Sequence, residues 1–147
     1  VGGSNPLELA AYLTDGEVSE WAGFAENNIG EADRSASLTF KVADLLVNAF
    51  VTTELTGEDK LTLVGTDGKI TVPNYIEAKV ATVETTSGTN QLVDQNQQSG
   101  LAYLLAHFNE CLAKGLVASP LVTPAQTIKA LTVIEDLYQR WYGDPLN

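Results

Sequence analysis

The sequence predicts an α+β domain in which a mostly antiparallel, open β-sheet carries its helices on one face. Three observations lead to this fold class. Short apolar runs that alternate with polar residues, separated by turn residues, occupy positions 18–93. Apolar residues then recur at helical spacing over 101–112 and again over 128–141. Strands gathered before helices favour α+β over a parallel α/β arrangement.

A short helix is expected at the start of the chain. Asn5 suits its N-cap, Pro6 its first helical position, and Glu8 can reach back toward the cap. The helix should run to about Leu13 and end at Asp15-Gly16.

The next segment should supply three strands of the sheet. We expect strands at Val18–Ala25, Ser37–Val42 and Leu45–Leu55, with a polar, acidic loop at 27–35 before the second strand. The middle strand alternates cleanly, so its apolar residues belong to one face, namely Leu38, Phe40 and Val42.

The opposite face of this sheet should be open and partly polar. Five residues are expected on it: Thr39, Lys41, Asn48, Phe50 and Thr52. Surfaces of this kind commonly meet another sheet or a ligand. We therefore predict a sheet interface here and a homo-oligomer formed through it.

Two hairpins should follow. The runs within Leu61–Pro73 flank Asp67-Gly68, a dipeptide that suits the positive φ values of a type I′ turn. A second pair of strands is expected at Lys79–Thr86 and Thr89–Val93, around Ser87-Gly88.

Two helices should complete the chain. The first has an apolar stripe and ends at Gly115; the stripe comprises Leu101, Leu104, Leu105, Phe108 and Leu112. The second opens on a capping box at 123–126, with Pro124 in its first turn, and closes at Gly143 and Pro145. Its wide apolar arc should be buried, and comprises Ile128, Leu131, Ile134, Leu137, Tyr138 and Trp141.

Length and composition limit the function classes. A chain of 147 residues, 44% hydrophobic and 18% charged, is the size and composition of one soluble domain. A formal charge of −11 disfavours nucleic acid and anionic membranes as partners. A single cysteine favours a reducing compartment, and no apolar run is long enough to span a bilayer, so we predict a cytoplasmic protein. The chain has no methionine and begins Val-Gly-Gly-Ser, which indicates a piece of a longer protein.

Few residues suggest chemistry of their own. A dyad of Cys111 with the only histidine, His107, fits the i, i+4 spacing, but a packed cysteine beside a boundary histidine is the simpler interpretation. No further ligands cluster there, so no metal site is predicted. Paired carboxylates could serve glycoside hydrolysis, although a solvated acidic surface is the simpler interpretation; they are Glu17, Glu20, Glu26, Glu31 and Asp33. Aromatic side chains that could stack on a ring, but more commonly form core or interface, are Trp21, Phe24 and Tyr75.

Several motifs resemble one enzyme family. The phrase L-x-G-T-x-G-x-I-x-V-P at 63–73 resembles a hairpin in the C-terminal domains of the Gfo/Idh/MocA oxidoreductases, especially the dihydrodiol-dehydrogenase-like branch. The segments 100–103, 109–115 and 118–121 are similar to the family's G-x-x-Y … C-L-x-x-G-x-x-x-S-P-L, and 3–7 to the entry into its first C-domain helix. The likeness is loose over nearly the whole chain and good over 61–143.

The resemblance implies a division of labour. Full-length members bind NAD or NADP in a Rossmann domain that carries a catalytic lysine, while the C-terminal domain contacts substrate and oligomerises. This chain has no Gly-x-Gly-x-x-Gly fingerprint, so we expect the Rossmann domain to be absent and the fragment alone to bind no cofactor and to be inactive.

The family's catalytic acid positions are not matched in this chain. The family's aspartate falls on Val1 and its His/Tyr acid on Asn5, and neither residue can transfer a proton near neutral pH. Catalytic residues therefore stay unassigned, and Asn5 is a candidate substrate contact only. A stand-alone binding module that uses the open sheet face is the alternative, and an unrelated hydrolase built on His107 is a third possibility.

Overall fold

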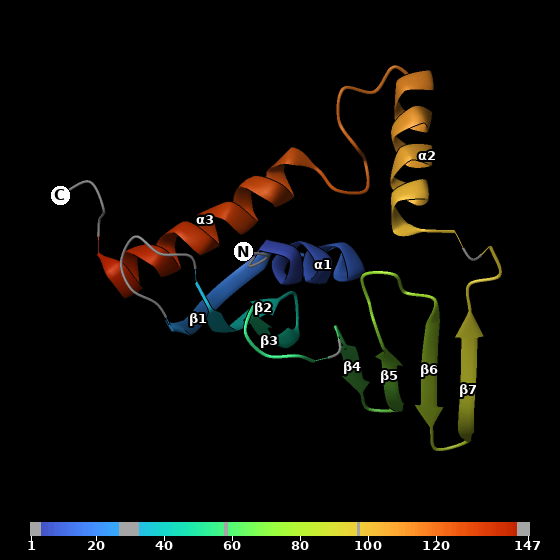
Figure 1. Ribbon diagram of the computed structural model, residues 1–147, viewed down its shortest axis with the longest axis horizontal. Helices are drawn as coiled ribbons and strands as arrows, with labels where there is room; N and C mark the ends of the chain where they lie inside the picture. Colours follow the sequence, from blue (N-terminus) through green and yellow to red (C-terminus); the bar gives the residue numbers. More distant parts are fainter. Residues whose placement is uncertain (1–3, 27–32, 58, 97, 144–147) are drawn as a thin grey trace. The chain divides into compact units, whose positions relative to one another are not determined.

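The structure is a computed structural model that describes residues 4–26, 33–57, 59–96 and 98–143 (Figure 1). The chain divides into two compact units, one made of 1–55 and 118–147 and the other of 56–117. The seven strands among the described residues form two antiparallel sheets, of three and four strands. The predicted α+β class with open antiparallel sheets is confirmed, although the strands are divided between two sheets. That the chain is a single domain stays a prediction.

The first unit pairs a three-stranded sheet with two helices. The sheet has the order β1-β2-β3, and the helices are α1 and α3. The bounds are α1 (Ser4–Thr14), β1 (Val18–Glu26), β2 (Ser35–Val42), β3 (Leu45–Thr52) and α3 (Pro124–Tyr142). Both helices pack on the same face of the sheet, where α3 contacts β1 and α1, and α1 contacts β2 (Figure 1).

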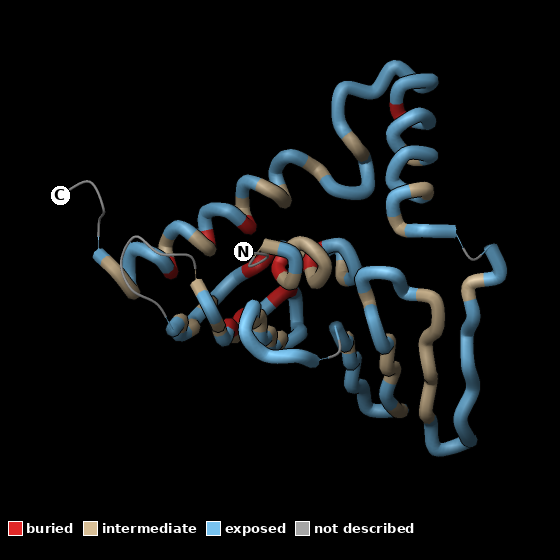
Figure 2. Tube along the Cα trace, in the orientation of Figure 1, coloured by how far each residue is buried: buried red, intermediate tan, exposed pale blue. Residues whose placement is uncertain are grey.

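The core of the first unit lies between those helices and the sheet. The alternation predicted for β2 is confirmed, because Leu38, Phe40 and Val42 are buried while the residues between them are not. Figure 2 shows the buried residues of this unit, in red, gathered where its helices meet the sheet. The buried cluster comprises Leu7, Val18, Leu38, Phe40, Val42, Ala130, Val133 and Leu137. Burial of this apolar surface makes the main favourable contribution to the free energy of folding of the unit.

Helix α3 buries a narrower face than its sequence predicts. Its capping box is confirmed, since the Thr123 side chain accepts from the Gln126 N–H and Gln126 accepts from the Thr123 N–H. Ala130, Val133 and Leu137 make the buried stripe, and Ile134 and Trp141 pack beside it. The predicted arc was wrong at Ile128 and Leu131, whose side chains are mostly exposed. Pro145 lies outside the described residues.

Several boundaries in the first unit differ from prediction, including the start of β2 at Ser35 instead of Ser37. Helix α1 already includes Ser4, so Asn5 lies in its first turn and does not cap it. Strand β3 ends at Thr52, three residues before the expected Leu55, because the Thr52 hydroxyl accepts from the N–H groups of Glu54 and Leu55 and turns the chain. Most of the loop expected at 27–35 lies outside the described residues.

The second unit is a meander of four strands followed by a helix. The sheet has the order β4-β5-β6-β7, and both predicted hairpins are present. The bounds are β4 (Leu61–Gly65), β5 (Gly68–Val72), β6 (Val80–Thr85), β7 (Gly88–Val93) and α2 (Gly100–Ala113).

The turn between β4 and β5 differs from the predicted one. Gly65 pairs with Gly68, so Thr66 and Asp67 are the central residues instead of Asp67 and Gly68. Neither Thr66 nor Asp67 has a positive φ, which rules out a type I′ turn. Gly68 is required for another reason: a Cβ atom there would lie 2.1 Å from the Glu84 carbonyl oxygen on β6.

Helix α2 is attached to its own unit through polar contacts. The Tyr103 hydroxyl donates to Asp94 Oδ2 over 2.9 Å, and Lys79 Nζ lies 3.5 Å from the same oxygen. A hydrogen bond from the Asn96 N–H, followed by the Tyr103 and Lys79 contacts, lowers the pKa of Asp94. The helix ends as predicted, with Gly115 at φ 66°. All five residues of its apolar stripe are exposed.

Candidate functional site

The free face of the first sheet brings together all five residues predicted for it. In antiparallel sheets, directly paired residues share a face, and here Thr39 pairs with Asn48 and Lys41 with Leu46. We call this surface the open face. It comprises Ala22, Phe24, Glu26, Ser35, Ser37, Thr39, Lys41, Leu46, Asn48, Phe50 and Thr52. Its predicted use as an interface is not tested by these positions.

Several polar groups of the open face have hydrogen-bond or ion-pair partners. Thr39 Oγ1 donates to Asn48 Oδ1 over 2.8 Å. Lys41 Nζ reaches both carboxylate oxygens of Glu20, at 2.9 and 3.0 Å. Because Thr39, Asn48 and Lys41 already have partners, another surface can cover them without leaving their donors or charges unmatched.

Aromatic side chains project from the same face. Ser37, on the central strand, pairs with Phe24 on β1 and with Phe50 on β3. The two phenylalanines are 82% and 60% exposed, and the serine between them is small. Leu46 adds a further exposed apolar side chain. Exposed aromatics beside internally satisfied polar groups are typical of the centre of a protein interface.

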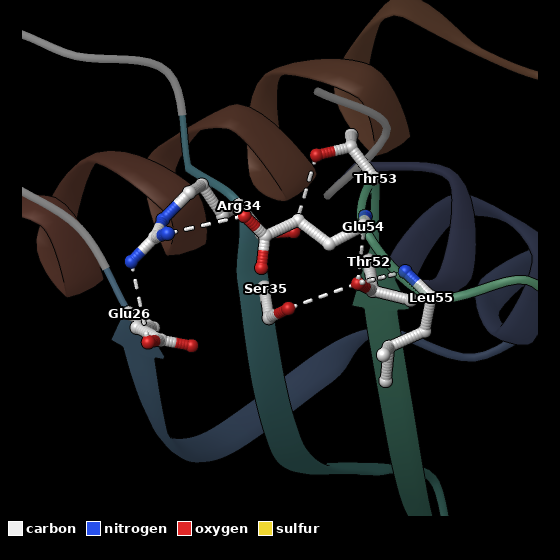
Figure 3. Close-up of polar contacts among 7 residues, drawn as sticks. All are labelled: Glu26, Arg34, Ser35, Thr52, Thr53, Glu54 and Leu55. Atoms are coloured by element: carbon white, nitrogen blue, oxygen red, sulfur yellow. Dashed lines mark hydrogen bonds and ion pairs between the residues drawn. The ribbon is translucent and has the colours of Figure 1, made fainter.

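One end of the open face is closed by a polar cluster (Figure 3). Ser35 and Thr52 share a hydrogen bond of 2.9 Å between their hydroxyl oxygens. Arg34 bridges the neighbouring strands, with its guanidinium 3.3 Å from Glu26 Oε1 and 3.1 Å from Glu54 Oε1. These exposed ion pairs fix the ends of β1 and β3 relative to β2 and add little free energy each.

A cavity of about 210 Å³ lies near the start of α1, within the first unit. Ser4 lines it at the helix start, Ile134 and Trp141 give it an apolar wall, and Asp33 and Tyr138 form a polar side. Its mixture of one carboxylate, hydroxyl groups and an indole is the chemistry that binds small hydroxylated molecules.

Asp33 and Tyr138 are coupled at this cavity. The Tyr138 hydroxyl donates to Asp33 Oδ2, and the Tyr142 hydroxyl donates to Asp33 Oδ1 over 3.0 Å. Partial burial, followed by the hydrogen bond and the negative charge of Asp33, raises the pKa of Tyr138 to about 12. The raised pKa keeps the phenol protonated well into the alkaline range, where it continues to donate its hydrogen bond to Asp33.

The remaining candidate residues are dispersed. Asn5 is exposed in the first turn of α1, and its role as a substrate contact stays a prediction. Cys111 Sγ lies 3.5 Å from His107 Nε2, and the cysteine is buried as a packed side chain would be.

Within the described ranges, no group of three or more His, Cys, Asp or Glu side chains is arranged to hold a metal ion. No helix in the described part of the chain has the length and apolar character needed to cross a membrane.

The acidic and aromatic candidates are separated as well. Glu20 and Glu26 form surface ion pairs, Glu17 is exposed, and Glu31 lies outside the described residues. Trp21 packs against the core, whereas Tyr75 is half-buried in the second unit. Sequence reasoning missed the pairing of Asp33 with Tyr138, because 105 residues separate the two and no local pattern links them.

Comparisons with known proteins give a likeness of fold. No protein-family model matches the sequence, and no curated protein matches it. Solved structures do match, among them an aldose–aldose oxidoreductase from Caulobacter crescentus, with 18% identity and a TM-score of 0.76 over 93% of this chain and 43% of that one. A dehydrogenase from Clostridium difficile gives 15% identity and 0.73, over 93% and 46%. A UDP-N-acetylglucosamine 3-dehydrogenase from Acidithiobacillus ferrooxidans gives 10% and 0.76, over 95% and 45%.

These structures support the resemblance seen in the motifs. They are oxidoreductases of the Gfo/Idh/MocA type, and the matched region is the C-terminal part of each chain. At 10–18% identity the likeness concerns the fold. This chain spans less than half the length of the structures it matches.

Proposed function

We propose that this chain is the C-terminal substrate-binding and oligomerisation domain of an NAD(P)-dependent oxidoreductase. The parent enzyme would transfer a hydride between nicotinamide and a hydroxyl or carbonyl carbon of a sugar-like or diol substrate. The observation that carries the proposal is the match of 93–95% of this chain to under half of each similar oxidoreductase. The family motifs at 63–73 and 100–121 support it independently.

The cofactor belongs to the other half of the parent in this proposal. The sequence has no Gly-x-Gly-x-x-Gly phosphate fingerprint, so NAD or NADP would bind to a separate dinucleotide-binding domain. We expect the isolated chain to be inert. The test is to incubate the purified chain with NAD(P)H or NAD(P)+ and a panel of polyols, aldoses and diols. Turnover by this chain would contradict the proposed division of labour.

The cavity beside α1 is the candidate substrate contact of this chain. Its Asp33 and Tyr138 groups suit a hydroxylated ligand, and it lies near the start of the helix that carries Asn5. A parent enzyme that carries Tyr138→Phe should show a raised KM for its substrate with an unchanged KM for the nicotinamide cofactor. An equal increase in the KM for substrate and the KM for cofactor would point to a general folding defect instead.

The open face is the proposed site of homo-oligomerisation. Phe24, Leu46 and Phe50 expose apolar surface, and the nearby Thr39 and Asn48 are already hydrogen-bonded to each other. Light scattering after size exclusion should show a dimer or larger assembly whose mass falls on the double substitution Phe24→Asp and Phe50→Asp. The matched control is Val64→Asp, an exposed apolar side chain on β4 of the second unit. A monomer at high concentration, or equal effects of both changes, would count against this interface.

A stand-alone binding module is the second candidate function. It would use the same open face, whose exposed aromatics are typical of a recognition surface. The coding sequence that precedes Val1 separates the two candidates, because a strand–Gly-x-Gly-x-x-Gly–helix unit there would favour the oxidoreductase. For either function we propose a cytoplasmic location, on the basis of the unpaired Cys111.

A further inference from the structure

A groove of about 780 Å³ runs along the helical side of the first unit. It lies between the C-terminal half of α1, the start of β1, the segment 120–123 and the first half of α3, all of which belong to that unit. Buried Leu7, Ala11 and Val18 contribute to its floor. Its rim includes exposed apolar side chains, namely Tyr12, Leu121 and Ile128. The volume is within the range of sites that hold small organic ligands.

One end of this groove carries uncompensated negative charge. Asp15 and Glu17 line that end, and neither has a hydrogen bond or ion pair among the described residues. The Gly16 N–H donates to the Ala11 carbonyl over 3.3 Å and closes α1, which has no basic residue in its last turn. Both carboxylates therefore stand at the negative end of the helix dipole, where a cation is favoured.

Asp15 also breaks a local rule of helix endings. Its φ of 50° places it in the left-handed region just after the helix, a position that glycine or asparagine usually occupies. An aspartate there has both an unfavourable backbone conformation and an unfavourable charge relative to the dipole. Such local conflicts in a sequence tend to mark functional positions.

Thr123, Gln126, Thr132 and Lys129, which also line the groove, already have partners. Thr123 and Gln126 complete the capping box, and the Thr132 hydroxyl donates to the Ile128 carbonyl over 2.9 Å. The one cation in the lining, Lys129, has its ammonium 5.0 Å from the centre of the Trp21 ring, which holds it by a cation–π contact. Among the described residues Lys129 makes no ion pair with Asp15 or Glu17, so neither carboxylate is paired with a cation of the groove.

We propose that this groove binds an organic ammonium ion. The apolar body of the ligand lies on the floor formed by Leu7, Ala11 and Val18, and its ammonium group meets the carboxylates of Asp15 and Glu17. Apolar contact supplies the affinity and the paired carboxylates select for positive charge. This site is independent of the proposed oxidoreductase function, since it uses neither the open face nor the cavity beside Ser4.

The test uses three probes with the same alkyl body and different charge: n-hexylammonium, n-hexanol and n-hexanoate. Each is titrated into the purified chain, and binding is followed by calorimetry and by NMR shifts of groove residues. We expect n-hexylammonium to shift Tyr12 and Ile128 and to bind about tenfold more tightly than n-hexanol, a difference of about 1.4 kcal/mol. Hexanoate should bind most weakly. Equal binding of all three, or shifts confined to other surfaces, would overturn the proposal.

Matched variants separate local recognition from the general attraction of an acidic chain. Asp15→Asn combined with Glu17→Gln should lower the affinity for n-hexylammonium about tenfold and leave n-hexanol unchanged. Asparagine also tolerates the left-handed conformation at position 15, so the helix end should be preserved. The control is Asp44→Asn, an exposed carboxylate in the turn between β2 and β3. An equal loss in the control would assign the binding to the net charge of −11 and reject the site.

Discussion

The indole Nε1 of Trp21 donates a hydrogen bond of 2.6 Å to Asp136 Oδ2, and this contact ties β1 to α3 across 115 positions of the chain. The same carboxylate oxygen lies 2.7 Å from Arg140 Nη2, so Asp136 is held from two sides. Lys129 covers the Trp21 ring from another turn of the helix. The network fixes the orientation of α3 on the sheet. It therefore also fixes the shape of the cavity beside Ser4 and of the groove lined by Asp15 and Glu17, because α3 lines both.

The first prediction concerns this tether. Trp21→Phe and Asp136→Ala should each lower the free energy of unfolding by about 1.5–3 kcal/mol, because the first removes the donor and the second the charged acceptor of a partly buried hydrogen bond. Urea unfolding of both single variants and the double variant gives the coupling energy between the side chains. Glu135→Gln, at an exposed position next to Asp136, is the matched control. Strictly additive effects of the two changes would show that the hydrogen bond contributes nothing.

The second prediction concerns the buried stripe of α3. Leu137 is fully buried against the sheet, and Leu137→Ala should cost about 2–5 kcal/mol through lost apolar contact and the cavity that remains. Leu131→Ala removes the same atoms from a side chain that is 55% exposed, so it should cost far less. Thermal or urea unfolding of the two variants measures the difference. Equal losses would mean that the predicted wide arc of α3 is buried after all.

The periodic parts of the sequence predicted the fold well. Leu38, Phe40 and Val42 alternate with polar residues, and that local pattern alone placed the core face of β2 and the opposite open face. The capping box at Thr123 and Gln126 likewise encodes the start of α3 within four residues. Where a few neighbouring residues determine the structure, sequence reasoning was sufficient.

Features set by distant contacts were not predictable in the same way. Leu131 lies on an apolar arc, yet which part of that arc is buried depends on how α3 meets α1 and β1. The carboxylate of Asp33 finds Tyr138 and Tyr142 only after the chain has folded. The prediction put Gly68 in the centre of the turn after Gly65. A glycine is needed there for a different reason, because β5 pairs with β6 and leaves no room for a Cβ atom beside the Glu84 carbonyl oxygen.

The third prediction tests that role of Gly68. Gly68→Ala would place a Cβ atom 2.1 Å from the Glu84 carbonyl oxygen, so β5 and β6 must separate locally. We expect a clear loss of stability and faster hydrogen exchange at the amides that pair these strands. Gly57→Ala is the control, because a Cβ atom there meets nothing within 4 Å. If Gly68→Ala behaved like the control, the close approach of the two strands would be refuted.

The fourth prediction concerns the pH dependence of stability that Tyr138 confers. Its pKa in the folded chain is about 12, above its usual value of 10.0, so folding favours the protonated phenol. The stabilisation is complete below about pH 10 and is lost as the pH rises toward the folded pKa. Urea unfolding between neutral and strongly alkaline pH should show this loss of stability in the unsubstituted chain. The Tyr138→Phe variant should show a flatter dependence of stability on pH.

Absorbance of tyrosinate gives a second readout of the same coupling. Among the five tyrosines, burial and an acidic neighbour raise the pKa of Tyr138 and of Tyr103, so both should ionise late, and Asp33→Asn should shift only the Tyr138 ionisation to lower pH because its adjacent negative charge is gone. Tyr12→Phe removes a phenol that lies away from Asp33 and should leave the late transition in place. If no late transition exists, or if Asp33→Asn leaves it unchanged, the Asp33–Tyr138 contact does not control the ionisation of this side chain.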